Sequence, residues 1–113
     1  MASRILEGKN ANHRIFFGVN AVANLTKELR KPLEELGSGD SPLEDLRVMM
    51  MVGLRFGEGD KKITLDNAGD IMDDIIAKNG FEYLSNELSK AINDTFGNKS
   101  EEMESEEKTE AGN

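Results

Sequence analysis

Residues 41–56 read SPLEDLRVMMMVGLRF, and this stretch decides the fold. Ser41 is a typical helix N-cap, Pro42 suits the first helical position because its missing N–H needs no partner there, and Glu44 completes a capping box. A helix is therefore predicted from Pro42 to about Phe56. Because its middle is apolar on every side, this helix must be enclosed by neighbouring elements or covered by a partner.

Two further helices are predicted downstream. Thr64 is a suitable N-cap, and the helix after it ends in Lys78-Asn79-Gly80, a basic last turn followed by glycine. A last helix begins at Phe81 and is closed by Gly97. Each helix carries an apolar stripe at helical spacing. The first stripe is Leu65, Ala68, Ile71, Met72, Ile75 and Ile76, and the second is Phe81, Leu84, Leu88, Ala91, Ile92 and Phe96.

Upstream of the central stretch, a helix is predicted from Gly18 to Lys31. Pro32 disfavours helical geometry at the residue before it, so this helix should end or kink there. Residues 32–36 can add one more turn before the glycine-rich linker at 37–41. The apolar residues of the predicted helix recur at spacings of three and four, and they are Val19, Val22, Leu25 and Leu29.

The N-terminal residues favour a β-hairpin. Residues 4–7 and 12–17 are short β-prone runs, and residues 8–11 between them contain glycine and asparagine. Two strands alone are only marginally stable, so the hairpin needs the helices to pack against. The predicted fold class is therefore α+β and mainly α-helical, with a short N-terminal β element followed by about four helices.

The chain of 113 residues has room for one domain, which we place at residues 1–97. Residues 98–113 are almost entirely charged and polar, so they cannot bury enough surface to offset their ordering entropy. We expect them to form a disordered acidic tail. No apolar run approaches the roughly 20 residues that span a bilayer, and no signal-peptide stretch is present. We therefore expect a soluble protein that stays where it is made and does not bind membranes.

Composition excludes several kinds of chemistry. The chain has no cysteine, which excludes disulfides, thiolate zinc sites and cysteine nucleophiles, and which fits a reducing cytosol. His13 is the only histidine, and with no partner near it in the sequence it is expected to pack or face water. Residues 37–41 lack the lysine and spacing of a phosphate loop. We therefore predict no enzyme, no cofactor and no bound metal.

The charge distribution bears on partners. The formal net charge is −8; residues 1–31 carry six Lys/Arg against two acids, residues 32–97 six against fourteen, and residues 98–113 two against six. Most of this molecule would repel a polyanion, so nucleic-acid binding is not expected. The basic first third is an ordinary helix surface in the simpler interpretation. In the alternative it meets an acidic partner, such as a second copy of the chain.

Acidic residues gather on the predicted helix after Thr64. Asp66, Asp70, Asp73 and Asp74 could suggest a metal or acid–base site, but no second type of group accompanies them, so a solvated face is expected. The loop before this helix resembles a calcium-binding loop only superficially. Its first ligand position would be Phe56 and its bidentate acid would be Asn67, so calcium binding is not expected.

The methionine run of the central helix allows two interpretations. Methionine fills irregular gaps in protein cores, and it also suits adaptable binding surfaces. The run can therefore be the centre of the core, or one side of the helix can meet a partner. For the second case we predict a contact set of Met49, Met50, Met51, Leu54 and Phe56.

Five segments of the chain match one known family in kind. They are Phe17-Gly18-Val19-Asn20-Ala21, the stretch from Leu25 to Leu36, the capped helix beginning Ser41-Pro42-Leu43-Glu44-Asp45-Leu46, the helix entry Ile63-Thr64-Leu65-Asp66, and the closing helix from Phe81 to Leu88. In these segments the chain resembles the tail assembly chaperones of long-tailed, siphovirus-type phages that infect Gram-positive bacteria. Together these span Phe17 to Gly97, about seventy per cent of the chain.

The resemblance implies a function. Such chaperones bind the long tape measure protein in the cytoplasm of the infected host, keep its hydrophobic helical segments soluble, and help to recruit tail tube protein. They are absent from the mature virion, and many are made in two lengths by a programmed frameshift. Two alternatives stay open: a structural head–tail connector or completion protein of the virion, and a small regulator that inhibits a host protein.

Overall fold

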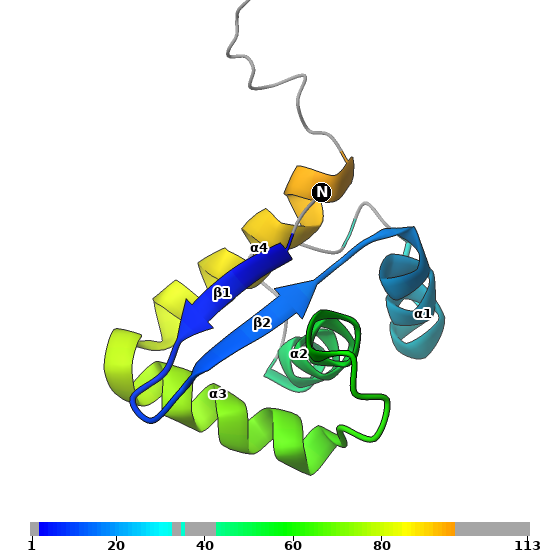
Figure 1. Ribbon diagram of the computed structural model, residues 1–113. Helices are drawn as coiled ribbons and strands as arrows, with labels where there is room; N and C mark the ends of the chain where they lie inside the picture. Colours follow the sequence, from blue (N-terminus) through cyan, green and yellow to red (C-terminus); the bar gives the residue numbers. More distant parts are fainter. Residues whose placement is uncertain (1–2, 33–34, 36–42, 97–113) are drawn as a thin grey trace, which may run out of the picture.

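The computed structural model describes residues 3–32, 35 and 43–96, and it has the predicted α+β, mainly helical architecture (Figure 1). The predicted cap at Ser41 and Pro42, the closing Gly97 and the tail from residue 98 lie outside the described residues. Of residues 32–36, where one more turn is predicted, only Pro32 and Glu35 are described, and Glu35 N donates to Pro32 O at 3.0 Å. The elements, in chain order, are β1 (Ser3–Glu7), β2 (Asn12–Phe16), α1 (Val19–Leu29), α2 (Leu43–Glu58), α3 (Leu65–Asn79) and α4 (Phe81–Phe96).

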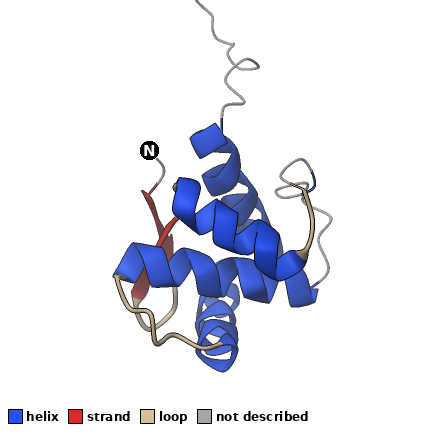
Figure 2. Ribbon diagram, turned by 90° about the vertical axis from the view of Figure 1, so that its right-hand side faces the viewer, coloured by secondary structure: helices blue, strands red, loops and turns tan. Residues whose placement is uncertain are grey.

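The two strands form the predicted antiparallel hairpin. Arg4 pairs with Ile15 and Leu6 with His13, and the turn is closed by a hydrogen bond from Gly8 N to Ala11 O. The hairpin lies along one side of the helices (Figures 1 and 2). Its inner face is buried at Leu6 and Ile15. The helices therefore supply the packing that an isolated two-stranded sheet lacks.

Helix α2 is the centre of the fold. It contacts β2 and each of α1, α3 and α4. The apolar stretch of residues 49–54 is buried along its whole length, which confirms the core interpretation of the methionine run. The side chains that complete the core come from every other element and from two connecting segments, namely Leu6, Ile15, Phe17, Ala21, Val22, Leu25, Ile63, Ala68, Met72, Ile75, Leu84, Leu88, Ala91 and Ile92.

Two glycines let α2 approach the hairpin unusually closely. A Cβ atom at Gly57 would lie 2.7 Å from Ile15 Cα, and one at Gly53 would lie 2.7 Å from the ring carbon Cζ of Phe17. Real Cβ atoms do not approach other heavy atoms so closely. Because the two glycines are four residues apart, they lie on the same face of the helix, and that face packs against β2.

The ends of the helices follow local sequence signals. Thr64 caps α3 as predicted; its side chain accepts from Asn67 N, and the Asn67 side chain accepts in return from Thr64 N. Gly80 ends the helix with a positive φ of 91° and donates its N–H to Ile76 O. Helix α1 ends at Leu29, two residues before the predicted Lys31, because Arg30 adopts left-handed geometry. Helix α2 runs to Glu58, two residues beyond the predicted end.

We predict opposite effects from two glycine substitutions. Gly57→Ala should lower the free energy of unfolding by about 1–2 kcal/mol, because the added methyl group overpacks against the β2 backbone and outweighs the gain in helix propensity. Gly69→Ala should raise it by about 0.5–1 kcal/mol, because its Cβ meets Arg47 Cδ only at an ordinary 3.5 Å. Urea denaturation measures both. Equal effects of the two substitutions would contradict the close α2–β2 contact.

Candidate functional site

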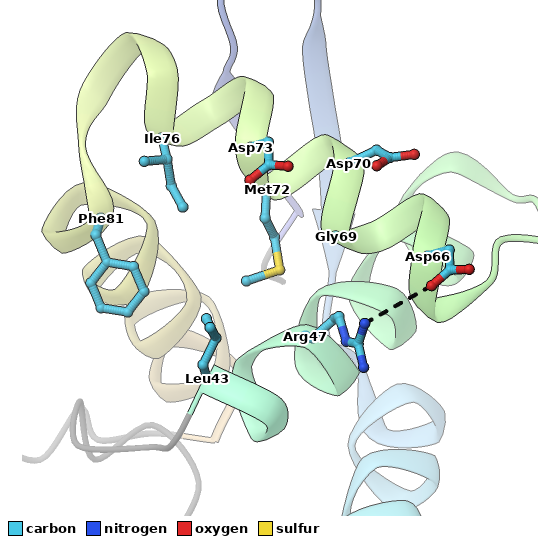
Figure 3. Close-up of a pocket in the computed structure, with 9 residues that line it drawn as sticks. All are labelled: Leu43, Arg47, Asp66, Gly69, Asp70, Met72, Asp73, Ile76 and Phe81. Carbon is cyan, nitrogen blue, oxygen red and sulfur yellow. Dashed lines mark ion pairs between the residues drawn. The ribbon is translucent and has the colours of Figure 1, made fainter.

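An open groove lies where the start of α2, one face of α3 and the start of α4 meet (Figure 3). Its volume is about 630 Å³. The residues that line it come from all three helices: Leu43 and Arg47 from α2, Asp66, Gly69, Asp70, Met72, Asp73 and Ile76 from α3, and Phe81 from α4.

Apolar side chains form the floor of the groove. Leu43 and Phe81 are 61% and 45% exposed, whereas Met72 is buried and Ile76 is half-buried. The four side chains converge from the three helices (Figure 3). Leu43 and Phe81 are each the first residue of a helix, where fewer neighbours cover a side chain than in the middle of the helix. Exposed large apolar side chains that gather in one hollow mark a surface suited to a partner.

Acidic side chains form the rim of the groove along α3. Asp66, Asp70 and Asp73 are exposed and follow helical spacing, so they share one face of the helix. Arg47 lies across from them, with its Nη1 atom 4.0 Å from Asp66 Oδ1. The groove can therefore bind an apolar group and a basic group together. Over residues 3–32, 35 and 43–96, no three His, Cys, Asp or Glu side chains gather as they would around a metal ion.

The predicted contact set lies elsewhere, on the middle and end of α2. Met49, Met50, Met51 and Leu54 are buried inside the monomer, beneath the chain's own elements. Phe56 alone of the five is exposed, at 41%. In this fold the four buried side chains serve the core, and only Phe56 offers surface to a partner. Leu43 is absent from the predicted contact set, and Phe81 belongs to the apolar stripe predicted for the last helix.

The expectation that Asp74 belongs to a solvated acidic face is wrong. Asp74 is half-buried against the hairpin turn, because it points about 100° away from Asp73 around α3. Its Oδ1 atom accepts from Asn10 N at 2.9 Å and from Asn10 Nδ2 at 2.8 Å. Its Oδ2 atom lies 3.1 Å from His13 Nε2, so His13 also has a partner that the sequence did not reveal.

This network docks the hairpin turn on α3. The backbone N–H of Lys9 donates to Asp74 O at 3.1 Å, and a Cβ atom at Gly8 would collide with the Asp74 carboxylate. The hydrogen bond from His13 is the main cause of a lowered pKa of Asp74; hydrogen bonds from the Asn10 and Ala11 backbones and the Asn10 side chain lower it further, and burial opposes them. The pair joins β2 to α3, and neither His13 nor Asp74 lines the groove.

We predict that the stabilising effect of Asp74 depends on pH. Because folding lowers its pKa, the ionised carboxylate stabilises the protein fully above its ordinary pKa of 3.8, and this stabilisation is lost as pH falls through the lower folded-state pKa. Asp74→Asn should therefore lower the melting temperature at neutral pH. The difference from wild type should shrink as the solution is acidified below pH 3.8.

Asp73→Asn is the matched control for this measurement. Asp73 is the exposed neighbour on the same helix, so its replacement should leave the melting temperature near that of the wild type throughout the titration. A penalty for Asp74→Asn that stays constant down to strongly acidic pH would contradict a role for the Asp74 charge.

Comparisons with protein-family models, with curated proteins and with solved structures gave no significant match for this chain. Over the described residues, no helix has both the length and the apolar character needed to cross a bilayer.

Proposed function

We propose that this chain is a phage tail assembly chaperone that binds the tape measure protein in the cytoplasm of the infected bacterium and assists assembly of the tail tube. In this proposal it works without catalysis, and it leaves the complex before the virion is complete. The groove carries the proposal, because exposed Leu43 and Phe81 meet there in a chain of low mean hydropathy, −0.53. The resemblance of residues 17–97 to that chaperone family supplies the client.

A groove of this kind suits a helical client. Amphipathic helices bind partners by laying an apolar edge into a hydrophobic groove, with side chains at helical spacing as anchors. Exposed Leu43 and Phe81, together with buried Met72, offer apolar contact to such a client in the groove. A client helix bound there would have its apolar side chains covered. Coverage of that kind keeps an aggregation-prone segment in solution until assembly.

Co-expression with the tape measure protein of the same phage tests this proposal. We expect the chaperone to bring the tape measure protein into the soluble fraction and to co-purify with it. Phe81→Ser should reduce the co-purified amount by about tenfold, because truncating a central aromatic anchor of an interface commonly costs over 1 kcal/mol. The amount is measured by quantitative mass spectrometry of the purified complex.

Phe56→Ser is the matched control. Phe56 is exposed to nearly the same degree as Phe81, but it belongs to the original contact set and does not line the groove. The groove proposal expects Phe56→Ser to retain the tape measure protein, provided that both variants melt like the wild type. If Phe56→Ser alone abolished binding of the tape measure protein, the binding surface would lie at the end of α2.

Mass spectrometry of purified virions distinguishes the alternative function. A head–tail connector or completion protein would be present in purified virions, whereas the proposed chaperone would be absent from them. A tape measure protein that stays insoluble and unbound would refute the proposed function, and detection of the chain in virions would favour the connector.

A further inference from the structure

We infer that the groove selects amphipathic helices whose apolar edge is flanked by lysine or arginine on the side that faces α3. This inference rests on the proposed function in that it defines the client segment such a chaperone would choose. It commits to one occupant, a helix of another protein. Two features of the groove define that occupant: the shape of its apolar floor and the charge of its rim.

The shape of the groove suits a helix that lies on the protein surface better than a small molecule, which needs an enclosed cavity. The groove is open along one side, and its apolar side chains come from three helices (Figure 3). Gly69, which has no side chain, lines the groove between Asp66 and Asp73. A volume of about 630 Å³ accommodates several large apolar side chains. Such side chains at successive turns of one helix can therefore enter together.

The rim selects the charge of the occupant. Asp66, Asp70 and Asp73 extend over roughly 10 Å of α3, given a rise of 1.5 Å per residue. Arg47 accompanies Asp66, but within the described part of the chain neither Asp70 nor Asp73 forms an ion pair. A helix alongside α3 with basic residues at the same spacing would face these two carboxylates. An acidic helix would be repelled by them.

The negative charge of the rim also disfavours the chain's own C-terminal residues as the occupant. Residues 98–113 carry six acidic and two basic residues, so they share the sign of the rim. The basic residues of the chain are concentrated in residues 1–31. A second copy of the chain could place its residues 1–31 in the groove. The test therefore includes a measurement of oligomeric state.

Fluorescence anisotropy with two synthetic peptides tests the inference. Both peptides have one length and one leucine pattern at helical spacing; one carries lysines beside the leucine edge and the other carries glutamates at those positions. We expect the full-length protein to bind the lysine peptide at least about tenfold more tightly than the glutamate peptide. Added salt should weaken binding of the lysine peptide, because exposed charges are screened.

Two double variants locate the effect. Asp70→Asn with Asp73→Asn should weaken binding of the lysine peptide by about tenfold and largely remove the preference over the glutamate peptide. Glu28→Gln with Glu35→Gln removes the same charge outside the groove, at two exposed positions, and should leave both affinities unchanged. Phe81→Ser should weaken the binding of both peptides.

Three results would overturn the inference: equal affinity for the two peptides, equal effects of the two double variants, or a dimer at working concentration that Phe81→Ser dissociates. The last result would assign the groove to a second copy. The outcomes also separate the inference from the proposed function. Solubilised tape measure protein without peptide selectivity would refute only the inference. Selective peptide binding without tape measure binding would refute only the function.

Discussion

The close contact between α2 and β2 is the constraint on which the rest of the structure depends. Gly53 and Gly57 remove the side chains that would hold the helix away, so the helix lies directly against Ile15 and Phe17. The hairpin can then cover an apolar helix that would otherwise face water on that side. The other sides of α2 are left for α1, α3 and α4, which close the core around the methionines.

The groove is a consequence of this arrangement. With its middle fixed in the core, α2 presents its first turn at the surface, where Leu43 lines the groove with Phe81 at the start of α4. Helix α3 is held from its other side by the hairpin turn, through Asp74 and Asn10. Asp70 and Asp73, on the neighbouring part of the helix surface, line the groove. One helix therefore carries Asp74, which is bonded to the hairpin turn, beside the exposed Asp70 and Asp73.

Local sequence signals predicted the elements of the fold well, because caps, prolines and apolar spacing act within a few residues. Thr64 and Gly80 bound α3 as expected, and the hairpin formed between the expected runs. The site was harder to predict, because it depends on contacts between distant residues. Nothing near His13 in the sequence indicates Asp74, 61 positions away. Phe81 matches the periodicity of a buried stripe, yet it lies at a helix start where its neighbours leave it exposed.

The most direct test of the account is photo-cross-linking in infected cells. Phe81 and, in a separate strain, Phe56 are each replaced by p-benzoyl-phenylalanine, which keeps an aromatic ring at a position of similar exposure. The account predicts a cross-link from position 81 to the tape measure protein and none from position 56. A cross-link to the tape measure protein from position 56 alone would contradict binding in the groove.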